Sequence, residues 1–268
     1  MTPDAVVAWL AEAGVDRGHH LGLAVDGRGA LGLAVGDSAV AVLVDQPFQL
    51  VGRLDERFAP RWVWWDRETA NAIATHRLPI DRCWDILTVH RLLDGGWQTS
   101  VGLAWAWLHG LPADSLPKVG QLGLLDEPGD EGVDPEDPVR PDGHLRPEWL
   151  ADGWRSTPDR LRAWAQLALR AAVLQEQRLD ERPLPDQALS TARSESAAEL
   201  LCAELEVEGL PIDEAEVGRI LASIVGERPT TWADEEAKRQ QRDAAVVSLL
   251  EPPLDVNLRN PGEVKAMR

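Results

Sequence analysis

The chain of 268 residues has little cysteine, no tyrosine, only two phenylalanines and a clear deficit of basic residues. Its two cysteines, Cys83 and Cys202, lie far apart and match no disulfide or metal-binding spacing. This spacing excludes a disulfide framework and a cysteine-rich metal site, and it predicts reduced thiols in a cytoplasm. No apolar run approaches the roughly 20 residues that a membrane-spanning helix needs, and the amino terminus lacks the features of a signal peptide. We therefore expect a globular cytoplasmic protein with no membrane partner.

The deficit of basic residues has its own consequence. With 27 Lys and Arg against 45 Asp and Glu, the formal net charge is −18. Phosphate contacts need clustered Lys and Arg, so this balance argues against a dedicated nucleic-acid binder and predicts weak affinity for DNA. Much of the acidity lies in residues 126–142, DEPGDEGVDPEDPVRPD, which show no apolar periodicity. We expect a mobile, solvated loop there, with a partner-binding acidic motif as the alternative.

The first half of the chain shows the pattern of an α/β domain. After a short amphipathic helix at 3–14, three β-like runs, Leu21–Val25, Leu31–Val35 and Val40–Val44, are separated by the turn sequences DGRG and GDS. This spacing predicts an antiparallel meander. A small helical element is expected within residues 47–60.

The stretch Arg61–Leu93 then predicts a strand at Trp62–Trp65 that ends on Asp66. A helix from Arg67 to about Arg77 should follow. A short strand leading to Asp85 and a helix at Ile86–Leu93 complete the stretch. A buried strand that ends on an Asp at the start of a helix is a common way to place a carboxylate in an α/β site.

The second half is predicted to be helical. The expected helices cover residues 101–108, Pro158–Arg178, Ser194–Glu208, Glu214–Val225 and 233–250, and a last helix begins at Pro261 behind the cap Asn260. The sequence DERPLP at 180–185 is interpreted as a linker, which predicts one domain at 1–185 and a second at 186–268. No helix-terminating signal precedes Arg268, so we expect the natural sequence to continue.

Two motifs in the tail resemble the start of the polymerase part of family A DNA polymerases, the bacterial DNA polymerase I-like family. They are Gly209-Leu-Pro-Ile-Asp213, a turn between two helices, and Asn257-Leu-Arg-Asn-Pro261, which opens a helix at the family's thumb. Upstream, LGLAVDGRG, WWDR and CWDILTVHRLL resemble three motifs of the family's 3′–5′ proofreading exonuclease domain. The chain is also similar to the actinobacterial proteins called bifunctional 3′–5′ exonuclease/DNA polymerase.

The resemblance implies a ribonuclease-H-like α/β fold, a mixed sheet with flanking helices, followed by an all-helical thumb segment. It implies a role in DNA replication or repair at the nucleoid, with DNA as partner and Mg²⁺ or Mn²⁺ as cofactor of the full-length polymerase. Such exonucleases hold two divalent metals with four carboxylates. In this chain Asp26 and Asp66 match two of the four, whereas Arg28 stands at the expected Glu. Trp164 and Ala168 stand at the Tyr and Asp of the last motif.

Three functional readings remain open. In the first, the exonuclease-like domain has lost its activity, Asp26 and Asp66 are vestiges, and the domain serves as a scaffold. In the second, it is an active, divergent metal-dependent exonuclease that uses Asp26, Asp66 and unrecognised ligands. In the third, it is a protein-interaction module whose segment 126–142 binds a repair protein. As plain structural roles, Asp26 and Asp66 could cap a turn and a helix, and Asp85 is interpreted as structural.

Other chemistries find little support in the sequence. Beyond the adjacent pair His19 and His20, the six histidines show no metal-binding spacing, and no GxSxG, P-loop or GxGxxG motif occurs in strand–helix context. The tryptophans are interpreted mainly as core residues. Trp97, Trp105 and Trp107 are the candidates for a surface that stacks on single-stranded bases.

Overall fold

The computed structural model describes residues 1–97, 99–116, 136–226, 228–249 and 257–266. By internal packing the chain divides into two compact units, Met1–Gly209 and Leu210–Arg268. The first unit is an α/β domain, as predicted. Among the described residues, no helix is long and apolar enough to cross a membrane.

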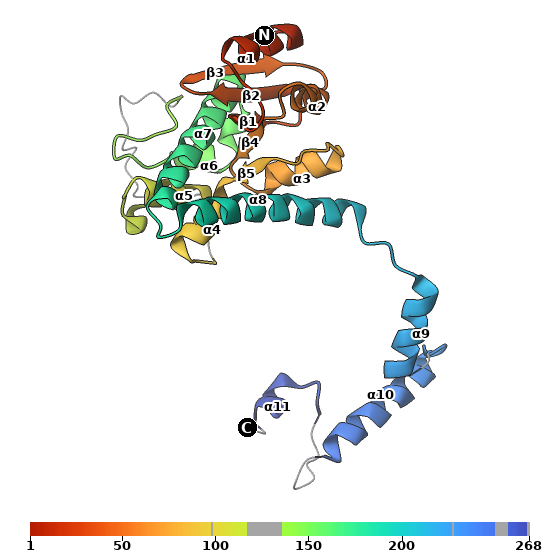
Figure 1. The fold of residues 1–268 in the computed structure, drawn as a ribbon. Coiled ribbons are helices and arrows are strands. Elements are labelled where there is room, and N and C mark those ends of the chain that lie inside the picture. Colours follow the sequence, from red (N-terminus) through yellow and green to blue (C-terminus); the bar gives the residue numbers. More distant parts are fainter. Residues whose placement is uncertain (98, 117–135, 227, 250–256, 267–268) are drawn as a thin grey trace. The chain divides into compact units, whose positions relative to one another are not determined.

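The first unit is built on a five-stranded mixed sheet with the strand order β3-β2-β1-β4-β5 (Figure 1). Its strands are β1 (His20–Val25), β2 (Ala30–Val35), β3 (Ser38–Leu43), β4 (Arg61–Trp64) and β5 (Cys83–Asp85). Strands β1, β2 and β3 pair antiparallel, which confirms the predicted meander. Strand β4 then pairs in parallel with β1, and β5 pairs in parallel with β4.

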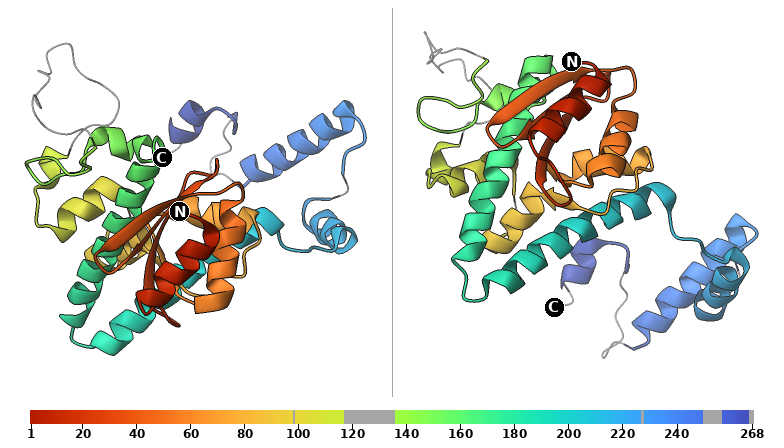
Figure 2. Two further views of the ribbon diagram at one scale, coloured as in Figure 1. Left: turned by 90° about the horizontal axis from the view of Figure 1, so that it is seen from above. Right: turned by 45° about the horizontal axis from the view of Figure 1, so that its top comes forward.

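Helices cover both faces of this sheet. They are α1 (Pro3–Glu12), α2 (Pro47–Phe58), α3 (Arg67–Thr75), α4 (Ile86–Asp94), α5 (Val101–Leu108), α6 (Pro147–Leu150), α7 (Pro158–Asp180) and α8 (Pro185–Glu208), with the 3₁₀ turns η1 (Ala113–Ser115) and η2 (Gly153–Arg155). Helices α1, α2 and α3 pack on one face and α4, α5 and α7 on the other (Figure 2). Alternate strand residues supply the two cores, as in β4, where Trp62 and Trp64 face one side and Val63 the other.

Helix α7 lies unusually close to the sheet at two glycines. A Cβ atom added to Gly32 of β2 would come within 2.1 Å of the backbone oxygen of Leu161, and one added to Gly22 of β1 within 2.4 Å of the oxygen of Ala165. The strands therefore carry no side chain where the helix backbone crosses them. A glycine inside a strand often marks such a close backbone approach.

Helix α8 starts earlier than the sequence pattern predicted. It begins at Pro185 rather than Ser194, because proline fits the first turn of a helix, so DERPLP is a tight corner between α7 and α8. Helix α8 packs on α3, α4, α7 and β5. The first compact unit consequently extends to Gly209, beyond the boundary predicted at residue 185.

In the second unit, the described residues form the helices α9 (Glu214–Val225), α10 (Trp232–Val247) and α11 (Pro261–Ala266). Asp213 caps α9 by accepting hydrogen bonds from the backbone N–H groups of Ala215 and Glu216. Helices α9 and α10 bury no residue, and Ile224 and Trp232 are 74% and 79% exposed. Their apolar faces are thus unpartnered within the described residues.

The close approach of α7 predicts that Gly32→Ala destabilises the protein. The new methyl group meets backbone atoms, which cannot rotate away, so we expect a loss of at least about 2 kcal/mol in the free energy of unfolding. Urea denaturation measures this loss. The matched control is Gly52→Ala in α2, where an added Cβ makes only ordinary contact, 3.4 Å from Leu78. Equal stabilities for the two variants would contradict the packing described for α7.

Candidate functional site

Three aspartates mark one edge of the sheet, which we call the carboxyl edge. Because β1, β4 and β5 run parallel and lie side by side, their carboxyl ends meet at this edge. Asp26 directly follows β1, Asp85 is the last residue of β5, and Asp66 comes two residues after Trp64, the last residue of β4. Edges of this kind commonly bind ligands in α/β proteins.

The side chain of Asp26 stabilises the turn that follows β1. Its Oδ1 atom accepts hydrogen bonds from the backbone N–H groups of Arg28 at 2.8 Å, Gly29 at 3.2 Å and Ala30 at 3.0 Å. This arrangement fixes the tight connection between β1 and β2. Arg28, at the position where the resemblance expects a second acid, is exposed at the tip of the same turn. Asp26 therefore has a complete structural role without a metal.

Asp66 caps helix α3. Its Oδ1 accepts a hydrogen bond of 3.0 Å from the backbone N–H of Glu68. Burial, and secondly the charge of Glu68, raise the pKa of Asp66, while backbone N–H donors and Arg155 partly oppose this. Arg155 also forms an ion pair of 2.6 Å with Glu68. This ion pair ties the turn η2 to the start of α3, beside Asp66.

Tryptophans fill the space next to Asp66 on the α7 side of the sheet. Trp65 lies 5.2 Å from Trp164, measured between ring centroids, and its indole N–H donates to the Trp164 carbonyl at 3.3 Å. Trp154 of η2 stacks on Trp164 at 5.6 Å between ring centroids, with the rings only 9° from parallel. The guanidinium of Arg155 covers Trp154 at 4.3 Å from the ring centroid. All three tryptophans are buried, so this region is a packed core rather than an open cleft.

Ala168 lies away from the carboxyl edge. Leu161 of α7 crosses Gly32, which pairs with Ala24, and Ala165 crosses Gly22, so α7 runs toward the start of β1. Gly22 precedes Asp26 by about 13 Å of strand, and Ala168 is about 4.5 Å further along the helix in the opposite direction. Ala168 is also fully buried in the apolar core. Both its residue type and its place differ from those of a fourth acid.

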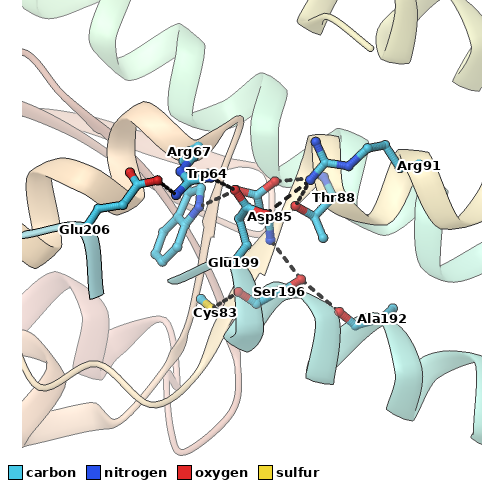
Figure 3. Close-up of polar contacts among 10 residues, drawn as sticks. All are labelled: Trp64, Arg67, Cys83, Asp85, Thr88, Arg91, Ala192, Ser196, Glu199 and Glu206. Atoms are coloured by element: carbon cyan, nitrogen blue, oxygen red, sulfur yellow. Dashed lines mark hydrogen bonds and ion pairs between the residues drawn. The ribbon is translucent and has the colours of Figure 1, made fainter. Parts of the chain in front are cut away.

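Asp85 is the most buried of the three aspartates, with 1% exposed. Its Oδ1 accepts from the backbone N–H of Thr88 at 2.8 Å, and its Oδ2 accepts from the indole N–H of Trp64 at 3.0 Å (Figure 3). Burial outweighs these hydrogen bonds and raises the pKa of Asp85 to about 6. Asp85 thus caps α4 and links it to β4, in agreement with the structural role expected from the sequence.

Helix α8 is fastened to this aspartate and to its surroundings. The backbone N–H of Asp85 donates to the Ser196 hydroxyl at 3.1 Å, and that hydroxyl donates to the Ala192 carbonyl at 2.9 Å. The thiol of Cys83, with a pKa raised to about 12 by burial, points to the Ser196 carbonyl at 3.3 Å (Figure 3). The reduced state expected for this thiol stays a prediction.

Ion pairs extend the attachment outward. Glu199 of α8 pairs with Arg67 of α3 and with Arg91 of α4, each at 3.3 Å, and Glu206 pairs with Arg67 at 2.6 Å (Figure 3). The sequence pattern alone does not predict this network. Its signal is a Ser on the buried side of a Glu-rich helix, which is visible only once α8 is placed against the sheet.

The side chains present do not fit a two-metal site. Mg²⁺ and Mn²⁺ need several oxygen ligands converging on one point. Asp26 and Asp66 each hold a turn or a helix through Oδ1, and Arg28 brings a positive charge where an acid is expected. Among the described residues, no group of three or more His, Cys, Asp or Glu side chains gathers as a metal site would require.

Other residues singled out from the sequence are now placed. Trp105 is a core residue, Trp107 packs partly buried against the core, and Trp97 is 96% exposed. His90 is buried, and neither of its ring nitrogens has a hydrogen-bond partner within the described chain. Of the acidic segment 126–142, residues 126–135 lie outside the described residues. Glu136 forms an ion pair with Arg160 at 2.9 Å.

We predict that Ala168→Asp strongly destabilises the fold. Ionised or protonated, the new carboxyl group would be buried in an apolar core without a partner, which costs at least about 3 kcal/mol. Thermal and urea denaturation measure the effect. The control is Ala197→Asp, the same substitution at an exposed position of α8. A stable Ala168→Asp protein would show that this part of α7 is open to water.

The raised pKa of Asp85 predicts a pH dependence of stability. Below pH 3.8 the carboxyl is protonated in both states; between 3.8 and about 6 it ionises only on unfolding, so stability falls as pH rises. Asp85→Asn should remove this loss, so the variant gains about 3 kcal/mol relative to the natural protein between pH 4 and pH 7. The two proteins should also differ in stability by an amount that does not vary with pH, because the Asn amide faces the Trp64 N–H.

The measurement is urea denaturation of both proteins at several pH values in this range. Groups that titrate in both proteins cancel in the difference. Asp186→Asn, which changes an exposed carboxylate at the start of α8, serves as the control. A difference between Asp85→Asn and the natural protein that does not vary with pH would refute the assigned ionisation.

Comparison with known proteins does not identify a family for this chain. No protein-family model, curated protein or solved structure matches it. The evidence on function is therefore the order of the strands, the residues at the carboxyl edge and the motifs of the sequence.

Proposed function

We propose that this chain is the N-terminal region of a DNA polymerase I-like, DNA-directed DNA polymerase of DNA replication or repair. In this proposal the first unit is a 3′–5′ exonuclease-like domain of ribonuclease-H-like fold that no longer cleaves DNA and serves as a scaffold. The second unit is the start of the polymerase thumb. Mg²⁺ or Mn²⁺ would serve the polymerase, not the first unit.

The arrangement of the sheet supports the ancestry. The resemblance expects a first strand ending near an Asp, two further strands, and then a strand that delivers Asp66 to a helix. The meander β1-β2-β3 with the parallel strands β4 and β5 agrees with that expectation. It also brings Asp26 and Asp66 to the same edge from neighbouring strands.

The loss of activity is supported by the neighbours of these two aspartates, and this observation carries the proposal. Asp26 and Asp66 are engaged as caps, Arg28 replaces one acid, and Ala168 is buried at a distance from the edge. Stacked tryptophans occupy the α7 side beside Asp66. A scaffold needs a rigid core and does not need an open cleft. The packed tryptophans form such a core and leave no open cleft beside Asp66.

The tail motifs support the thumb assignment. Asp213 caps α9, and the Asn260 side chain accepts a hydrogen bond of 3.0 Å from the N–H of Gly262 at the start of α11. The apolar side chains on α9 and α10 remain exposed, which is expected of helices that pack within a larger domain. These helices lack a core of their own among the described residues.

A nuclease assay tests the inactive-scaffold reading against the active-exonuclease reading. We expect the purified chain to release no nucleotides from single-stranded DNA with Mg²⁺ or Mn²⁺ above the level of the Asp66→Ala variant. Both proteins are purified in parallel, so a contaminating nuclease appears equally in each. Metal-dependent degradation that Asp66→Ala abolishes would sink the proposal and establish a divergent exonuclease.

A further inference from the structure

A groove of about 610 Å³ lies at the opposite end of β1 from Asp26. It is bounded by the outward side of α7, the loop before β1 and the turn between β2 and β3, with His20, Gly36 and Leu169 among its lining residues. Its volume falls within the roughly 300–1,000 Å³ typical of small-molecule sites. The groove belongs to the first unit and shares no residue with the carboxyl edge.

One wall of the groove is apolar. Leu169, Val173 and Leu174 of α7 face Val35 at the end of β2. Val173 is 44% exposed, which leaves a branched apolar side chain open to water in the middle of a long helix. A flat, weakly polar ring system that covered this wall would remove that apolar surface from water.

The same helix brings two polar groups that lack partners. Gln166 donates through its side-chain nitrogen to the Gly36 carbonyl at 2.9 Å, while its Oε1 is shielded from water and accepts no hydrogen bond. Arg170, one turn further on, is exposed and forms no ion pair or hydrogen bond within the described residues. The guanidinium of Arg170 is therefore available to a ligand beside the apolar wall, whereas the buried Oε1 atom of Gln166 is not.

The charges around the groove limit which ligands it can bind. Burial, with Arg61 as the next cause, lowers the pKa of His20 to about 4, so this imidazole is neutral near pH 7. Arg170 is then the lining residue with a permanent positive charge, and Asp37 on the turn opposite α7 is the lining carboxylate. One guanidinium suits one phosphate group. A longer nucleic-acid strand would meet a chain of net charge −18.

We propose that this groove binds a nucleoside 5′-monophosphate. The base lies on the wall formed by Leu169, Val173 and Leu174, beside the rings of His19 and His109. The phosphate binds the guanidinium of Arg170, a pairing that Arg makes with two parallel hydrogen bonds. An amino group on the base can donate a hydrogen bond to the carboxylate of Asp37. This site does not depend on the proposed polymerase function.

Isothermal titration calorimetry with deoxyadenosine 5′-monophosphate on the full chain tests the proposal. We expect saturable binding of one nucleotide per chain. Arg170→Ala should weaken it about tenfold or more, the usual effect of losing a hydrogen bond to a charged group. Val173→Asp should abolish it by placing a carboxylate in the apolar wall. The matched control is Arg162→Ala on the same helix, outside the groove, which should bind like the natural protein.

Two further ligands separate the parts of the site. Deoxyadenosine, which lacks the phosphate, should bind about tenfold more weakly and should not respond to Arg170→Ala. Octanoate tests the rival occupant, an amphipathic carboxylate. Absence of nucleotide binding, equal binding of nucleoside and nucleotide, insensitivity to Arg170→Ala, or binding of octanoate but not the nucleotide would each overturn the proposal. Both Arg170 and Val173 are solvent-accessible, so we expect their variants to fold, and circular dichroism checks this.

Discussion

The close contact between α7 and the first two strands is the constraint on which the rest of the first unit depends. Two glycines, Gly22 and Gly32, allow the backbone of α7 to lie directly on the strands, and Ala165, Ala168, Ala171 and Ala172 continue that contact without bulk. These contacts fix both the distance of the α7 axis from the sheet and its direction. Its direction decides which residues reach the carboxyl edge, namely those of its first turns, and which lie toward the start of β1.

Fixing α7 in this way creates two different environments along one helix. Near its beginning, Trp164 meets Trp65 and Trp154, and the space beside Asp66 becomes solid core. Near its middle, the helix rises past the end of β2, and Gln166 and Arg170 face a groove instead. The end of the sheet that resembles a catalytic site is therefore filled, while the opposite end is open.

A second constraint holds the other side of the sheet together. Asp85 is buried, accepts from Trp64 and Thr88, and presents its backbone N–H to Ser196, so three elements meet on one residue. The ionised form of such a residue is penalised by burial, and its neighbours compensate only in part. The charged part of the contact between α8 and the rest of the domain lies nearer the surface, where desolvation costs less. It consists of the ion pairs of Glu199 with Arg67 and Arg91. Helix α8 is thus an integral part of the domain.

The sequence predicted local structure well and long-range packing poorly, for identifiable reasons. The turn DGRG predicted the β1–β2 connection because Asp26 and the glycines encode it within five residues. The caps of α3 and α4 were likewise local. The predicted start of α8 is too late because DERPLP is interpreted as a linker, although proline also suits the first turn of a helix. The short elements α6 and η2 went unpredicted.

The candidate site shows the same division. Asp26 and Asp66 were located correctly at strand ends, but the tryptophan packing and the position of Ala168 depend on how α7 crosses the sheet. Gly22 and Gly32, single glycines inside strand patterns, were the available signal for that crossing. The groove beside Arg170 had no local signal, since its walls come from α7, a loop and a distant turn.

Under the proposed function, these contacts would account for the two aspartates that remain at the carboxyl edge. An Asp that caps a turn or a helix contributes about 1 kcal/mol to stability, enough to make its replacement unfavourable. A metal ligand that has no such second role, such as an acid at position 28, brings only charge repulsion once the metal is no longer needed. If a four-acid site loses its function, the acids that have no structural role are therefore expected to be replaced first. The carboxylates that remain would be those that hold backbone N–H groups, which is the role observed for Asp26 and Asp66.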